Sequence, residues 1–358
     1  MERSKKSIIL LRIIFSGILL SYQAYSQNKP LVGAYYFDGW TGKYPYHITE
    51  SLKDSFPDRK PKWGWVTSTQ EIIDEQIKLA ADSGISFFSF CWYYGAGNFK
   101  TEALNQALRF YLVSPQKKRL KYCLLIANHA GNEIGPTEWD QVSAEWIEKF
   151  KVDTYLKVDG KPLLIFFSIN SLIKKFGTIE NVHSALDNLR SAALKAGLNG
   201  VSIAVCIGPN KENIQQAESC GFDVLTGYNY HDVGIYKALN REVPIDTMRV
   251  AEQRYWNRFP KLSSLKYIPV STLNWDPRPW ANKSNGYASA PYFVGYSPNS
   301  VYKSVKGCID WVNANPQFTT KEKIALLYAW NENGEGAWLT PGINGVNMLD
   351  GLKKAMNK

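Results

Sequence analysis

The sequence predicts a (β/α)8 barrel, the α/β fold in which eight parallel strands alternate with helices around a closed core. Eight short apolar runs recur along the 358 residues, and segments of helical character separate them. The runs are hydrophobic almost throughout, which is typical of parallel strands that are buried on both faces. A chain of this length also fits one barrel domain. An open, doubly wound sheet is the alternative that the same alternation allows.

The expected strands are bounded by polar or glycine-containing turns. They comprise residues 31–37, 85–92, 122–127, 163–168, 201–206, 223–228, 267–272 and 325–330. Two long connections, residues 38–66 and 274–297, each follow a strand. Loops that follow strands lie on the catalytic face of such a barrel, so we expect both connections to border a site there.

The clearest expected helix spans residues 68–83. Ser68 and Glu71 have the spacing of a capping box, and Gly84 provides the stop. The other helices are expected to begin close to Thr101, Thr137, Thr178, Lys211, Val243, Ser300 and Val346.

The N-terminus has the pattern of a secretory signal peptide. A basic region containing Lys5 and Lys6 precedes the apolar residues 7–20, and small residues precede Gln27. We expect cleavage after Ser26, which leaves residues 27–358 as one catalytic barrel domain, exported to the periplasm or the extracellular space. A retained membrane anchor is the alternative, but the segment is short for a span. After cleavage we expect no membrane association.

Charge and cysteine content exclude several classes of protein. The net charge of +10 is spread among acidic residues and forms no basic block, so we expect no nucleic-acid partner. The five cysteines form no Cys-x-x-Cys or Cys/His cluster, so we expect neither a metal site nor a disulfide framework. The sequence leaves open whether Cys220 and Cys308 form a single disulfide. We expect no cofactor and a monomeric protein.

The residues at the ends of the expected strands are mainly aromatic, amide and acidic. In a sugar site, rings stack on pyranose faces, while amides and carboxylates bind hydroxyl groups. An oligosaccharide or polysaccharide is therefore the expected substrate. Some of these residues also suit structural roles, Tyr36 in the core and Asp38 in a turn. The candidate substrate-binding residues are Tyr36, Asp38, Trp40, Trp92, Tyr93, Tyr94, Asn128, His129, Tyr228, Asn229, Tyr230, His231, Asn274, Trp275, Asp276 and Asn331.

Glu332 and Glu335 are the candidate catalytic pair. They follow the last expected strand, and Gly334 and Gly336 allow a tight turn. In one helical turn, side chains three residues apart share a face, with Cβ atoms about 5–6 Å apart. Mutual repulsion and burial would separate their titrations, which leaves one carboxyl as an acid and the other as a base. The alternative is a pair of solvated surface glutamates.

Residues 330–336, Trp-Asn-Glu-Asn-Gly-Glu-Gly, resemble the signature of glycoside hydrolase family 99, the endo-α-mannosidases, and of the related WbsX-like proteins. Residues 32–36, 84–94 and 155–164 add weaker similarity. The resemblance implies a barrel that cleaves α-mannosides with retention through a 1,2-anhydro sugar. By motif position, Glu332 would deprotonate the 2-hydroxyl, and Glu335 would protonate the leaving oxygen and later activate water. Asn333 stands where the family often has an aromatic residue, so the identity of the sugar in the substrate remains open.

Three functions fit these features. The first is a secreted retaining glycoside hydrolase acting on a mannose-containing or related glycan. The second is a WbsX-like glycosyltransferase or transglycosylase of surface polysaccharide, and the third is a non-catalytic glycan-binding barrel. The export signal favours the hydrolase, because nucleotide-sugar donors are cytoplasmic and the sequence has no nucleotide-binding glycine loop. His129 and His231 lack a matching nucleophile motif, which favours hydrogen bonding to substrate over a triad.

Overall fold

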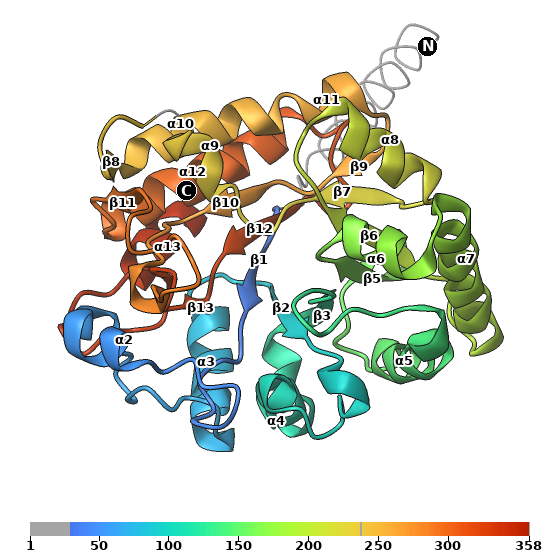
Figure 1. Ribbon diagram of the computed structural model, residues 1–358, viewed down its shortest axis with the longest axis horizontal. Helices are drawn as coiled ribbons and strands as arrows, with labels where there is room; N and C mark the ends of the chain where they lie inside the picture. The colour runs from blue at the N-terminus through green and yellow to red at the C-terminus, as the bar shows by residue number, and fades with distance from the viewer. Residues whose placement is uncertain (1–28, 237, 358) are drawn as a thin grey trace, which may run out of the picture.

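The computed structural model describes residues 29–236 and 238–357, and the expected signal peptide lies outside them. Its main sheet is a parallel barrel surrounded by helices (Figure 1). The predicted (β/α)8 fold is confirmed, because all eight predicted runs contain strands of this sheet. The strands are β1 (Leu31–Tyr36), β2 (Phe87–Trp92), β3 (Lys121–Ile126), β5 (Lys161–Phe166), β6 (Ser202–Cys206), β7 (Val224–Thr226), β9 (Lys266–Tyr267), β10 (Val270–Thr272) and β12 (Ile324–Tyr328).

The barrel closes through its seventh strand, which is split into two short halves. The first half, β9, pairs with β7, and the second half, β10, pairs with β12. Pro269 lies between the halves and has no N–H to donate, but its carbonyl accepts a 2.9 Å hydrogen bond from Leu326 N. On the other side, Ile268 N donates to Leu225 O over 2.9 Å. The two ends of the sheet therefore belong to one extended segment, and the open-sheet alternative is wrong.

The helices lie mostly around the outside of the barrel (Figure 1). They are α2 (Glu50–Ser55), α3 (Gln70–Asp82), α4 (Gln106–Val113), α5 (Pro136–Phe150), α6 (Ile169–Phe176), α7 (Ile179–Lys195), α8 (Lys211–Ser219), α9 (His231–Ile235), α10 (Ile245–Trp256), α11 (Phe259–Leu262), α12 (Pro298–Ala314) and α13 (Leu349–Met356). The sequence did not indicate the short helices α2, α6, α9 and α11. Within the described residues, none of the helices is long and apolar enough to cross a membrane.

Three predicted helix starts need correction. The helix expected from Thr101 begins at Gln106, after the 3₁₀ turn Ala103–Asn105. The helix expected from Ser68 is capped by Thr69, whose side chain accepts a hydrogen bond from Ile72 N, while the Ser68 hydroxyl donates to Asp38 over 3.1 Å. Residue Val243 belongs to β8 (Glu242–Pro244), which pairs with β11 (Tyr292–Val294), and α10 begins only after Pro244. At Ser68 and Val243, a contact with a distant segment determines the conformation of the residue and overrides its local preference for helix.

Alternation along the strands divides aromatic residues between two layers. On β1, Tyr35 points into the barrel and its hydroxyl donates to Gly227 O over 2.6 Å. Its neighbour Tyr36 points outward and packs between Phe88 and Phe90, with ring centroids 5.2 and 5.0 Å away. Successive strand side chains face opposite sides, so a strand end delivers only every second residue to the barrel interior.

All five cysteines are free thiols. Cys220 and Cys308, whose pairing the sequence left open, are each buried and unbridged. The protein therefore depends on its apolar core rather than on disulfides for stability.

Candidate active site

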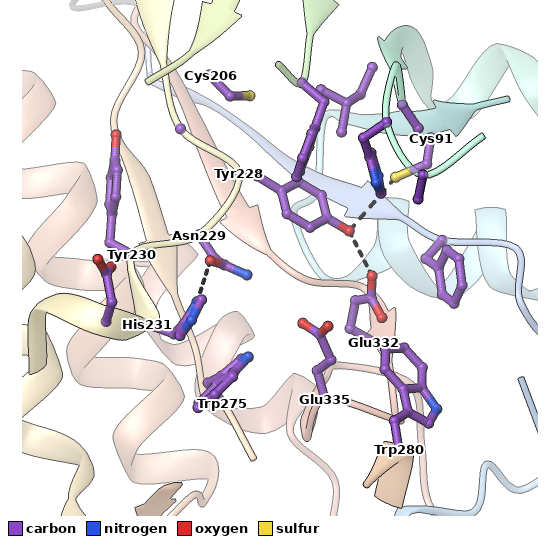
Figure 2. A pocket seen from close by; sticks show the side chains of 18 of the residues that line it. Cys91, Cys206, Tyr228, Asn229, Tyr230, His231, Trp275, Trp280, Glu332 and Glu335 are labelled. Atoms are coloured by element: carbon purple, nitrogen blue, oxygen red, sulfur yellow. Dashed lines mark hydrogen bonds between the residues drawn. The ribbon is translucent and has the colours of Figure 1, made fainter. Parts of the chain in front are cut away.

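A cavity of about 1070 Å³ lies at the ends of the barrel strands. Its walls come from residues that follow β2, β3, β6, β7, β10 and β12, which is the face where barrel enzymes place their chemistry. Figure 2 shows both glutamates pointing into it, together with tyrosine and tryptophan rings. The predicted site residues that line it are Tyr93, His129, Tyr228, Asn229, Tyr230, His231, Trp275, Glu332 and Glu335.

The two glutamates are carried by a β-hairpin, so the predicted helical turn is wrong. Strand β13 (Asn331–Glu332) pairs antiparallel with β14 (Ala337–Trp338), and Glu335 N donates to Glu332 O over 3.1 Å. The turn needs both of its glycines. Gly336 has a φ of +77°, and a Cβ on Gly334 would lie 2.2 Å from the ring of Trp280.

An arginine from a distant loop supports this turn. Arg59, at the end of the 3₁₀ segment Pro57–Arg59, donates to the carbonyls of Asn333 and Gly334 over 3.3 and 3.2 Å. It also forms a buried ion pair with Asp276, whose backbone N–H donates to Glu335 O over 2.7 Å. The carbonyl groups of the turn are thus held by donors, which fixes the backbone from which Glu335 projects.

Each glutamate is bound on one oxygen by a tyrosine. The Tyr228 hydroxyl donates to Glu332 Oε1 over 2.6 Å, and the Tyr328 hydroxyl donates to Glu335 Oε2. Only 4% of Glu332 is exposed, and among the described residues its Oε2 atom has no hydrogen-bond partner. A buried carboxyl oxygen without a partner is costly, and a ligand hydroxyl in the cavity would satisfy it.

Burial raises the pKa of both glutamates above its ordinary value. The pKa of Glu332 is raised further by the nearby charge of Glu335, against the lowering effect of the Tyr228 hydrogen bond. The Tyr328 hydrogen bond lowers the pKa of Glu335. The two carboxyls titrate as a coupled pair in which the pKa of Glu332 is raised more strongly, so Glu335 ionises first.

Aromatic rings flank the glutamates on two sides, and Figure 2 shows Glu335 between Trp275 and Trp280. On one side His231 stacks on Trp275 at 4.0 Å between ring centroids. On the other, the ring of Trp280 contacts that of His47 at 5.9 Å between ring centroids. Flat rings on both sides of a carboxyl pair suit pyranose faces on either side of a reacting bond.

The histidines in the cavity are suited to hydrogen bonding. Burial lowers the pKa of His129 and of His231, so both imidazoles are neutral near pH 7. Nδ1 of His231 is 2.7 Å from the amide oxygen of Asn229, which accepts. The His231 ring therefore donates from Nδ1 and presents Nε2 as an acceptor for a ligand hydroxyl.

The remaining predicted residues lie behind the cavity wall. Tyr36 and Trp92 face outward, and Trp92 packs on Trp146 of α5 with centroids 5.6 Å apart. Tyr94 stacks on Phe99 at 6.4 Å. These three rings are on the outer side of their strand ends because side-chain direction alternates along a strand.

Polar members of the prediction hold loops in place. The Asn128 side chain bonds both backbone groups of Ser168, with its Nδ2 2.7 Å from Ser168 O. The Asn331 amide likewise bonds both backbone groups of Phe37. The Trp40 indole donates to Asn331 O over 2.8 Å. The contacts of Asn331 and Trp40 fix the entry to the glutamate hairpin.

Three further predicted residues are buried acids and amides with structural partners. Asp38 accepts from Ala107 N over 2.5 Å, and burial raises its pKa to about 8. Asn274 Nδ2 donates to Gly336 O over 2.6 Å, and Asp276 binds Arg59 and Arg278. Asn274 and Asp276 therefore support the turn without lining the cavity.

Several lining residues were not among the predicted ones. Asn210 and Asn213 follow β6, so their place after a strand was a usable signal. Phe37 and Phe167 directly follow β1 and β5 and gave the same signal. The other aromatic, polar and cysteine residues of the lining gave no such signal, because they lie inside strands, on helices or within long loops. They are Cys91 and Cys206, Asp232 and Tyr255, and His47, Asn132, Trp280 and Tyr287. Within residues 29–236 and 238–357, no group of three or more His, Cys, Asp or Glu residues is arranged to hold a metal ion.

The closed parallel barrel, with paired carboxyls at its carboxyl-terminal face, has the fold of (β/α)8 glycoside hydrolases. The chain belongs to the family described as Glycosyltransferase WbsX, whose model matches residues 64–349. This match confirms the family resemblance found in the glutamate motif.

Solved structures support the same fold. A family 99 endo-α-mannosidase from Bacteroides thetaiotaomicron is 13% identical, with a TM-score of 0.59 over 91% of this chain and 96% of that one. The same kind of enzyme bound to bis-tris propane is 12% identical, with a TM-score of 0.60 over 91% and 95% of the two chains. A glycoside hydrolase-like protein is 15% identical, with a TM-score of 0.61 over 92% and 94%. A search of curated proteins gave no match.

Proposed function

We propose that the protein is an exported, retaining glycoside hydrolase that cleaves a mannose-containing or related glycan, with Glu332 and Glu335 as its acid/base pair. One observation carries the proposal. Each of the two buried carboxyls is bound by a tyrosine on one oxygen, and Glu332 has a second oxygen without a partner in a cavity large enough for several sugar rings. This arrangement fits two carboxyls that exchange protons with a bound glycan.

The family 99 resemblance supplies the roles within this proposal. Glu332 removes the proton of the substrate 2-hydroxyl, and the resulting oxygen attacks the anomeric carbon as Glu335 protonates the leaving oxygen. The 1,2-anhydro sugar that forms is opened by water. In that step Glu335 removes a proton from water and Glu332 returns one to the 2-oxygen, so the anomeric configuration is retained and both carboxyls recover their starting states.

Substrate binding explains how the proton reaches Glu335. Without substrate, the pKa of Glu332 is the more strongly raised of the two. A sugar hydroxyl that donates to Glu332 Oε2 stabilises the ionised form of Glu332 and lowers its pKa. The proton of the pair then favours Glu335, which is the state needed to protonate a leaving group.

The charges in the cavity favour hydrolysis of a neutral glycan over transfer from a nucleotide sugar. Three carboxyl side chains line the cavity, those of Asp232, Glu332 and Glu335. The nucleoside diphosphate of a nucleotide-sugar donor would place its negative charges beside these groups, which is unfavourable in a partly desolvated site. A transglycosylase remains the second candidate, because it shares every step up to the 1,2-anhydro sugar and uses a sugar hydroxyl in place of water.

The test is a product screen of the protein without residues 1–26 on α-mannans, other polysaccharides and glycoproteins, read by chromatography and mass spectrometry. Glu332→Gln and Glu335→Gln should each lower kcat by about 10³-fold or more on the best substrate, because each removes one proton-transfer step. Glu71→Gln, on the exposed side of α3, serves as the matched control and should retain full activity. Wild-type rates in either site variant would refute the assignment.

Export belongs to the same proposal and needs its own measurement. We expect the mature protein to begin at Gln27 and to be recovered outside the cytoplasm when the full chain is expressed in a bacterium. N-terminal sequencing of the fractionated protein decides this point. A protein that retains residues 1–26 in the membrane fraction would favour the anchor alternative.

A further inference from the structure

Two exposed tyrosines lie beside the mouth of the cavity. Tyr44 is 79% exposed and Tyr46 is 72% exposed, and their ring centroids are 6.2 Å apart at an interplanar angle of 82°. The residues that alternate with them, Pro45 and His47, line the cavity. The exposed rings are therefore continuous with the cavity wall, on the side where Trp280 lies.

The loop that carries the tyrosines is fixed at several points. His47 Nδ1 lies 3.0 Å from Pro45 O, and the His47 ring packs edge-on against Phe37 at 4.9 Å between ring centroids. The Thr49 hydroxyl donates to Pro279 O over 3.0 Å, which joins this loop to the one that carries Trp280. Because the loop is already fixed, little binding free energy is lost to ordering it when a ligand stacks on these rings.

A single exposed aromatic residue is ordinary, but two adjacent ones bordering a cavity form a binding surface. Tyrosine presents a flat apolar face with a polar tip, so it contacts the apolar face of a sugar ring while the sugar hydroxyl groups stay in water. The neighbouring Lys43 donates to Gln106 of α4 over 2.9 Å, so its side chain is held against that helix. The surface formed by Tyr44 and Tyr46 therefore offers mainly flat rings, which suit the faces of a sugar strand.

We infer that Tyr44 and Tyr46 form a rim subsite that binds a distal part of a polysaccharide strand whose reacting bond lies at Glu332 and Glu335. The inference rests on the proposed function and adds to it that the natural substrate is a polymer that extends beyond the cavity. The rim subsite takes no part in the chemistry. It increases the affinity for long substrates by adding contacts outside the cavity.

The test compares long and short substrates in the double variant Tyr44→Ala/Tyr46→Ala. On α-mannan, or on the polymer that the wild-type protein cleaves best, KM should rise about 10-fold with kcat unchanged, as expected for losing two exposed ring contacts. On a di- or trisaccharide of the same linkage, which the cavity holds alone, both constants should stay within about twofold. Leu194→Ala, a 58% exposed residue on α7, is the matched surface control.

Binding measured without turnover separates this inference from the proposed function. Glu335→Gln protein should be retarded in a native gel containing the polymer, and adding the two tyrosine changes should abolish most of the retardation. If the wild-type protein hydrolyses nothing but is retarded through the tyrosines, the proposed function fails and the rim subsite stands.

Three results overturn the rim subsite. The first is equal loss of activity on long and short substrates, and the second is unchanged KM and retardation on the polymer. The third is failure of the wild-type protein to bind any polysaccharide gel. If the second result is accompanied by a change in the oligomeric state of the variant, measured by light scattering, the tyrosine surface contacts a second copy of the chain instead.

Discussion

The Tyr228 hydroxyl donates a 2.6 Å hydrogen bond to Glu332 Oε1, and this contact joins the segment after β7 to the glutamate hairpin. The ring of Tyr228 is held edge-on against Tyr328 and tilted against Tyr35, with centroids 4.9 Å away in each case. Tyr328 in turn donates to Glu335. Two neighbouring tyrosines thus contact the two carboxyls separately, which allows each carboxyl to be perturbed alone.

Tyr228→Phe should move the alkaline limb of the kcat/KM profile to higher pH. The hydrogen bond from Tyr228 lowers the pKa of Glu332, the group that loses the second proton of the pair. Without it that pKa rises, and the singly protonated pair persists to higher pH. The check is a pH series on the substrate found in the screen, and an unmoved alkaline limb would contradict the assignment.

Tyr328→Phe should move the acid limb instead. The Tyr328 hydrogen bond lowers the pKa of Glu335, which ionises first. Its loss raises that pKa, so the doubly protonated, inactive pair persists to higher pH and the acid limb shifts upward. The same pH series serves here, with Tyr228→Phe as the paired control. A shift of both limbs in either variant would mean that the tyrosines do not act on separate carboxyls.

Arg59 should act as a positioning residue for Glu335. Arg59→Lys keeps the positive charge beside Asp276 but cannot donate to two turn carbonyls and to that carboxylate together. We expect kcat to fall about 10- to 100-fold with KM changed by less than about threefold, because a displaced carboxyl weakens the transition state more than ground-state binding.

The control for Arg59 separates positioning from folding. Arg119→Lys changes an exposed arginine that is paired with Asp82, and its effect on kcat should be negligible. Thermal melts of both variants show whether the fold is retained. A fall in kcat that simply follows the melting temperature, with no change in the split between kcat and KM, would indicate a structural role only.

Glu252 should make the protein less stable as pH rises. It is fully buried on α10, where it accepts from Thr272 N over 2.7 Å, and burial raises its pKa to about 8. Because its pKa is higher in the folded protein, Glu252 contributes its full stabilisation at a pH below its pKa in the unfolded chain, about 4.5. This stabilisation is lost as the pH rises toward 8. Urea midpoints should therefore fall between pH 5 and pH 8, and Glu252→Gln should reduce that fall. Equal slopes in both proteins would show that Glu252 does not titrate in this range.

Much of this architecture could be predicted from local pattern. Near-continuous apolar runs separated by helical segments identify buried parallel strands, because such strands have no solvated face. That pattern placed Glu332 and Glu335 after the last strand, and the closed sheet confirms the strand order. The family assignment likewise depended on a contiguous motif and is confirmed.

Which strand-end residues enter the cavity was a different question. Tyr93 lines it, while its neighbours Trp92 and Tyr94 do not. A shift of one residue reverses side-chain direction, and the sequence does not state which face of a doubly buried strand points inward.

The sequence by itself determined the barrel, its strand order and the position of the glutamate pair, because these depend on residues close together in the chain. Only the tertiary structure decided how the pair is held and charged. Arg59 reaches Asp276 across 217 positions, and Tyr228 reaches Glu332 across 104. Burial and hydrogen bonding fix a carboxyl pKa through neighbours in space, and barrel closure brings those neighbours together from opposite ends of the chain.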